Sequence, residues 1–239
     1  MADWAIIAIT GAAVLLGSLV QSSVGLGVGL IAAPVLTLLA PELMPGAMLI
    51  VTFSLPLLTT GREMAHIDWR GIRWAFAGRI AGTVAGVWVV AMVSRTLLDL
   101  LVAGVILTAV ILSVTAPSIR RSPATLVAAG TASGVFGTAT SIGGPPVALL
   151  YQHAPGPEVR ATLGAFLGLG TALSIASLAV AGQLSWDEVV AGLWLLPFLL
   201  AGFALAGPLR RYLDGGRTRT ALLAVSALSA TVLAARALL

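Results

Sequence analysis

The chain has 239 residues, of which 59% are hydrophobic and 9% are charged, and its formal net charge at pH 7 is +4. Soluble domains carry about 25% charged residues, so this composition excludes a protein whose whole surface faces water and indicates one embedded in lipid. The excess of arginine does not indicate a nucleic-acid partner, because these residues fall in short loops between apolar segments rather than along one stripe.

Ten apolar segments follow one another along the chain, separated by charged residues or by proline and glycine. Each is predicted to be a helix, because a strand edge in lipid would leave backbone polar groups unpaired. Several are about 20 residues long, enough to span about 30 Å of hydrocarbon; the second, third and seventh are shorter. The segments are 4–21, 26–40, 45–60, 73–93, 96–116, 124–140, 145–154, 161–181, 189–209 and 218–239.

Two glycine-rich turns join the first segment to the second and the sixth to the seventh. The first turn is residues 22–27, with the sequence SSVGLG, and the second is residues 140–146, with the sequence TSIGGPP. Each turn marks a helix break or hairpin. The sequence leaves open whether these hairpins cross the membrane fully or re-enter on the same side.

The same two turns reveal an internal repeat. The tripeptide Ser-Val-Gly at 23–25 corresponds to Ser-Ile-Gly at 141–143, and Trp69 corresponds to Trp186. The halves are predicted to be residues 1–120 and 121–239, with about five segments each. Because five is an odd number, the second half must enter the membrane in the opposite direction. We therefore predict an all-α polytopic membrane protein built from two inverted-topology repeats.

The distribution of arginine predicts the orientation in the membrane. The loop after the third segment carries Arg62, Arg70 and Arg73, whereas the equivalent loop in the second half carries Asp187 and Glu188 and no basic residue. Loops rich in arginine face the cytoplasm. The sequence thus predicts a multi-pass protein of the cytoplasmic (inner) membrane with both termini outside.

The candidate binding residues gather in the two turns. Irregular backbone at membrane depth is tolerated where it lines a cavity, and helix N-termini favour anions. Glycine lets the backbone approach a ligand, and hydroxyl and amide groups add neutral donors. The alternative is that small residues only allow tight helix packing. The candidates are Gln21, Ser22, Ser23, Gly25, Gly27, Thr140, Ser141, Gly143, Gly144 and Pro145.

Two arginines complete the candidate site. Arg79 is the only charge well inside a predicted helix, where it would either snorkel to the interface or attract an anion. Arg160 is expected at the cytoplasmic mouth of the second turn, or as a determinant of topology. Every Asp and Glu falls at a segment end or in a loop, so no buried acid is predicted. His66 and His153 lack the spacing of metal ligands, and we predict no metal, cofactor or catalytic residue.

The turn motifs resemble those of the TauE/SafE family of sulfite (organosulfonate) exporters. The resemblance implies a membrane transporter, not an enzyme, that exports sulfite, a sulfonate such as sulfoacetate, or a related small anion. The residues before the first turn, 21–23, depart from the family pattern, so their expected role rests on donor chemistry alone. The motifs are Gly25-x-Gly27-x-Gly29 with Pro34, Gly134-x-x-Gly137, Ile142-Gly143-Gly144-Pro145-Pro146 running to Leu150-Tyr151, and Arg160-Ala161-Thr162.

The predicted function is therefore export of a small anion by alternating access, with the two glycine turns facing each other near the midplane. The predicted partners are this anion and the lipid bilayer. An importer or channel for another small anion or sulfur compound is the main alternative, and a membrane-embedded enzyme or a subunit of a larger complex is a further one. The sequence leaves a homo-oligomer open.

Overall fold

The computed structural model describes residues 4–24, 27–59, 64–115, 119–213, 227, 231–233 and 235. These residues form helices and turns with no strand among them, so the all-helical prediction is confirmed. Most of the predicted segment 218–239 lies outside the described residues. The elements are α1 (Trp4–Val24), α2 (Val28–Leu39), η1 (Pro41–Leu43), α3 (Gly46–Thr59), η3 (Met64–His66), α4 (Trp69–Met92), α5 (Arg95–Thr115), α6 (Pro123–Thr140), α7 (Gly144–Tyr151), α8 (Gly156–Val180) and α9 (Trp186–Leu213).

Five of the described helices are long and apolar enough to cross a membrane. Three others are shorter: α2 has 12 residues, α3 has 14 and α7 has 8. At 1.5 Å per residue they extend about 18, 21 and 12 Å, less than the roughly 30 Å of a hydrocarbon core. The predicted shortness of the second, third and seventh segments is confirmed. The five candidate spans are Trp4–Ser22, Trp69–Met92, Arg95–Leu112, Gly156–Val180 and Trp186–Ala206.

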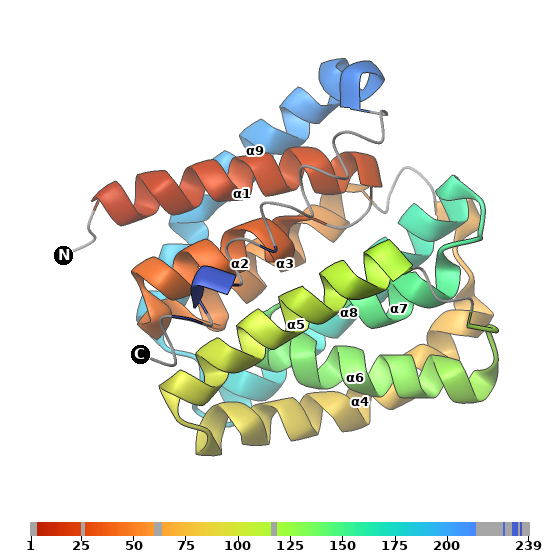
Figure 1. Cartoon of the computed structure of the whole chain (residues 1–239), viewed down its shortest axis with the longest axis horizontal. Coiled ribbons are helices and arrows are strands. Elements are labelled where there is room, and N and C mark those ends of the chain that lie inside the picture. The colour runs from red at the N-terminus through yellow and green to blue at the C-terminus, as the bar shows by residue number, and fades with distance from the viewer. Residues whose placement is uncertain are drawn as a thin grey trace.

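Helices far apart in the sequence lie side by side. Figure 1 shows α1 running along α9 and α4 running along α6, and both pairs are in contact. Helix α3 contacts both α8 and α9, and α8 also contacts α4. The buried apolar side chains form two clusters, one built mainly by α1, α2, α3 and α5 and the other by α4, α6, α7 and α8.

Glycines bring α4 and α6 into backbone contact. A Cβ atom added at Gly82 would collide with the carbonyl oxygen of Thr131, and one added at Gly130 would collide with that of Ala75. Small residues allow this close approach between helices in lipid. The sequence analysis gave tight helix packing as the alternative role of the turn glycines. The glycines of α4 and α6 have that role.

A polar network ties helix ends together around Asp68. Its carboxylate caps α4 by accepting from the N–H of Gly71 at 2.9 Å, and it also accepts from the Tyr151 hydroxyl at 2.9 Å. Arg121 donates to Glu158 at 2.7 Å and lies 4.7 Å from the centre of the Tyr151 ring. The hydrogen bond that it donates to Glu158 raises the pKa of Arg121, so this arginine stays charged. The network connects the start of α4 to the end of α7.

Glu188 lies at the start of α9 and is only 4% exposed. Its carboxylate accepts from the N–H of Gly46 at 2.9 Å and from the N–H and hydroxyl of Ser185 at 2.7 and 2.9 Å. The prediction that no acid is buried is therefore wrong. Glu188 does lie at a helix start, as the sequence indicates, but the start of α3 covers it, and that contact joins residues far apart in the chain.

Candidate anion-binding site

The first glycine turn folds back along α1. A Cβ atom at Gly17 would lie 2.7 Å from the Cα atom of Val28, so α2 begins beside an interior turn of α1. The side-chain oxygen of Gln21 accepts from the N–H of Val28 at 2.9 Å and so caps the N-terminus of α2. Gly25 and the side chain of Ser23, both candidates from the sequence, lie outside the described residues.

The second turn folds back along α6 in a similar way. Ser141 ends α6 in the left-handed region, with φ at 61°, and the Ser133 hydroxyl donates to the carbonyl of Gly143. Helix α7 therefore starts beside the middle of α6. Its cap residue, Gly143, has no side chain to pair with the N–H of Gly144, and the two prolines that follow carry no N–H. A Cβ atom at Gly29 would lie 3.2 Å from the carbonyl oxygen of Ser141, so the start of α2 contacts the second turn.

A cavity of about 40 Å³ lies between the two turns. One buried water needs roughly 10–15 Å³ of such volume, so the space suits a small polyatomic anion. Residues of α1, α2, α3, α4, α6 and α8 reach it, together with the second turn and the start of α7. The lining residues are Gln21, Gly27, Gly29, Leu30, Thr52, Arg79, Gly137, Ser141, Ile142, Gly143, Gly144, Pro145, Leu167 and Thr171.

Arg79 is buried beside this cavity, with an exposure of 1%. Its Nη1 atom donates to the carbonyl and the hydroxyl of Ser133, both at 2.7 Å, and Nη2 donates to the Ser174 hydroxyl at 3.2 Å. The Nε atom has no hydrogen-bond partner. Among the described residues, no carboxylate forms an ion pair with Arg79. The guanidinium is enclosed by protein rather than exposed at the surface, which the snorkelling alternative would require.

Three glycines make the space that the guanidinium occupies. Added Cβ atoms at Gly137 and Gly170 would each lie 2.7 Å from a guanidinium nitrogen, and one at Gly143 would lie 2.5 Å from Nη1. The ring of Phe166 closes another side, with its centre 5.7 Å from the guanidinium carbon, where a cation–π attraction favours the charge. The described part of the fold therefore accommodates a cation in this interior without an acidic partner.

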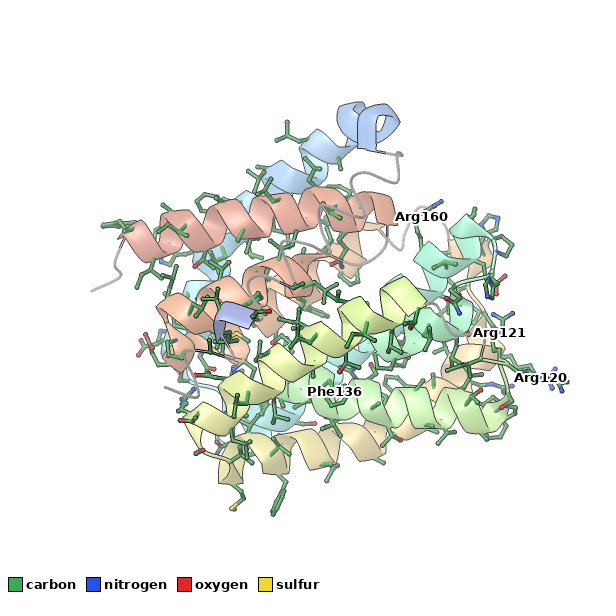
Figure 2. All side chains as sticks on the ribbon, viewed as in Figure 1. Arg120, Arg121, Phe136 and Arg160 are labelled. Carbon is green, nitrogen blue, oxygen red and sulfur yellow. The ribbon has the colours of Figure 1, made fainter. Side chains whose placement is uncertain are left out.

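Three of the predicted site residues do not line the cavity. The Ser22 hydroxyl donates to the carbonyl of Ser18 at 2.7 Å, and the Thr140 hydroxyl donates to that of Phe136 at 2.7 Å. Arg160 lies near the start of α8, at the end of the bundle that also carries Arg120 and Arg121 (Figure 2). The structure brings together Gln21, Gly27, Arg79, Ser141, Gly143, Gly144 and Pro145.

The sequence-based prediction missed Thr52 and Thr171, which line the cavity from α3 and α8. Both lie in apolar helices that carry no glycine turn, so no break in the sequence points to them. A signal was nevertheless present. The two threonines are separated by 119 residues in the numbering, close to the offset between the glycine turns, so the predicted repeat gives them nearly the same position in each half.

A comparison with protein families gives a match over nearly the whole chain. The family model described as sulfite exporter TauE/SafE matches residues 9–233, which include both turns, Arg79 and both cavity threonines. No significant match is found among the curated proteins or among the solved structures.

Proposed function

The chain belongs to the TauE/SafE sulfite exporter family, and from this premise we propose that its central cavity binds a small sulfur oxyanion, which the protein exports across the cytoplasmic membrane by alternating access. The family is one of membrane transporters for sulfur anions, and the apolar helices make the chain a multi-pass membrane protein. The observation that carries the proposal is the burial of Arg79 at a cavity, with no acidic partner among the described residues.

A buried charge is unfavourable unless an opposite charge or enough hydrogen bonds compensate it. Arg79 makes three hydrogen bonds to neutral oxygens and keeps Nε unpaired. An anion in the cavity would supply the missing charge, and guanidinium groups bind oxyanions well. The N-terminus of α7, at Gly143 and Gly144, adds a partial positive charge and backbone donors on the same cavity.

The packing of the helices supports a carrier made of two inverted halves. If α1 to α4 correspond in order to α6 to α9, then α1 against α9 is the counterpart of α6 against α4, and α3 pairs with its own counterpart, α8. All three pairs are in contact. Rocking of such halves about a central site alternates access. An inside-negative potential favours outward movement of an anion by about 2.3 kcal/mol per charge and 100 mV.

Sulfite efflux from liposomes that contain the purified protein tests this function. We expect efflux above that of protein-free vesicles, and a loss of roughly 10- to 100-fold on Arg79→Gln, because a hydrogen bond to a charged group contributes about 1.5–3 kcal/mol. Arg120→Gln is the matched control, since Arg120 is exposed at the bundle end (Figure 2). Thermal unfolding in detergent checks that each variant is folded.

Three outcomes would contradict parts of this proposal. Absence of flux for sulfite, sulfonates and other oxyanions would exclude the exporter. Unchanged efflux in a folded Arg79→Gln protein would exclude the assigned site while leaving transport intact. Chemical conversion of the anion without flux would favour the membrane-embedded enzyme.

A further inference from the structure

Two hydroxyl groups that line the cavity donate their hydrogen bonds to backbone carbonyls and not to the cavity. The Thr52 hydroxyl donates to the carbonyl of Met48 at 2.8 Å, and the Ser141 hydroxyl donates to the carbonyl of Pro45 at 2.9 Å. In both bonds the hydroxyl must be the donor, because a carbonyl oxygen can only accept a hydrogen bond. What remains at each hydroxyl is an oxygen lone pair, which repels an ionised oxygen but accepts a bond from a protonated one.

The charges around the cavity point to a ligand with one negative charge. Among the described residues that line it, Arg79 is the charged one, and none is an Asp, Glu or His. The titratable groups described above, Glu188 and the network around Asp68, lie at helix ends and do not line the cavity. A second negative charge would lack a full partner in an interior of low dielectric constant, where unpaired charge is most unfavourable.

We propose that the site selects a singly charged oxyanion that keeps one acidic proton, which for sulfite is hydrogensulfite. This inference rests on the proposed function and deepens it. The donors that line the cavity, Arg79 and the N-terminus of α7, hold the ionised oxygens. The acceptors, Thr52 and Ser141, receive the hydrogen bond from the protonated oxygen. A fully ionised dianion matches the donors and is opposed by the acceptors.

The transported proton then travels on the anion itself. Each hydrogensulfite that leaves takes one proton with it, so proton movement requires no titratable side chain in the cavity. The pH dependence of transport follows the second ionisation of the ligand, which for sulfite lies near neutral pH. The absence of any acid from the described cavity lining is therefore compatible with net proton export.

Efflux at a constant total sulfite concentration and a series of pH values tests the transported species. We expect the rate of sulfite efflux to be proportional to the concentration of hydrogensulfite. Above the second pKa of the ligand, the rate should therefore fall about tenfold for each unit by which the pH rises. A pH-sensitive dye inside the vesicles should report alkalinisation, because the remaining dianion takes up protons. Protein-free vesicles correct for leakage of neutral sulfur dioxide.

Two other outcomes of this experiment separate the inference from the proposed function. A rate that stays constant or rises with pH, with acidification inside, shows transport of the dianion and overturns the inference while the exporter stands. Absence of sulfite flux at every pH overturns the proposed function as well.

A variant pair tests the two acceptors directly. Thr52→Val combined with Ser141→Ala removes both oxygens; we expect hydrogensulfite affinity to fall about tenfold and the affinity for methanesulfonate, a monoanion without an acidic proton, to stay unchanged. Thr52→Ser should retain hydrogensulfite binding. Ser54→Ala is the matched control, because the Ser54 hydroxyl donates to a carbonyl of the same helix at 3.0 Å but does not line the cavity.

The two ligands distinguish recognition from damage to the fold. Equal loss of affinity for hydrogensulfite and methanesulfonate in the double variant, or unchanged affinity for both, would overturn the assignment of Thr52 and Ser141 as acceptors.

Discussion

Arg79 can be buried because several residues facing its guanidinium are glycines, which carry no side chain. Gly143→Ala tests this arrangement at a single atom. The added Cβ would lie 2.5 Å from Nη1 and 3.0 Å from the carbonyl oxygen of Ser133, so the guanidinium must move. We expect sulfite affinity to fall roughly tenfold or more, as hydrogen bonds to the charge are lost. Isothermal titration calorimetry on the detergent-solubilised protein measures the change.

Gly104→Ala is the control for this substitution, because a Cβ at Gly104 meets no atom of another element within 4 Å among the described residues. Its sulfite affinity should equal that of the wild type. Unchanged affinity in a folded Gly143→Ala protein would mean that the guanidinium position is not what the anion recognises.

Helices α4 and α6 depend on backbone contact, so their pairing should respond to one methyl group. Gly78→Ala places a Cβ against the carbonyl oxygen of Val127. Because a backbone atom cannot rotate away, the helices must separate, and we expect a loss of about 1–3 kcal/mol in the free energy of unfolding. The shift of the thermal unfolding midpoint in detergent, relative to Gly104→Ala, measures it. A midpoint equal to the control would argue against this close packing.

Helix α7 is held at its far end by the Tyr151 hydroxyl, which donates to Asp68 at 2.9 Å. Tyr151→Phe removes this bond and keeps the ring, so we expect destabilisation of about 1.5–3 kcal/mol, the range for hydrogen bonds to charged groups. Denaturant or thermal unfolding provides the measurement. Thr115→Val serves as the control, because Thr115 is exposed and its hydroxyl donates within its own helix. Equal stability of the two variants would show that α7 does not depend on this contact.

The orientation of the whole molecule follows from charge at its two ends. Arg120, Arg121 and Arg160 lie at one end of the bundle (Figure 2). Helix α8 has 25 residues and so extends about 37 Å from that end towards the turn that precedes Asp187. The positive-inside rule predicts that the arginine end is cytoplasmic.

The chain contains no cysteine, so single cysteines report this orientation without background. We expect a membrane-impermeant maleimide to label Asp187→Cys in intact cells and Arg120→Cys only after permeabilisation. Both positions are exposed. The reverse pattern would invert the predicted topology, and labelling of both in intact cells would contradict a location on opposite sides.

The sequence by itself determined the helical class, the approximate segments, the two glycine turns and the candidacy of Arg79. These features depend on local composition: apolar length, helix-breaking residues, and the high cost of a charge in lipid. Helix boundaries agree to within a few residues for most segments, because caps and glycine or proline breaks are local. The family resemblance, now confirmed, rests on the turn motifs.

Only the tertiary structure decided which residues share the cavity. Thr52 and Thr171 reach it from helices without a break, whereas Ser22 and Thr140 turn to carbonyls of their own helices. The guanidinium of Arg79 stays inside because glycines of other helices leave space for it. Glu188 is buried because the start of α3 covers it. Such contacts join residues far apart in the chain, and the free energy of burying a charge depends on those neighbours rather than on local sequence.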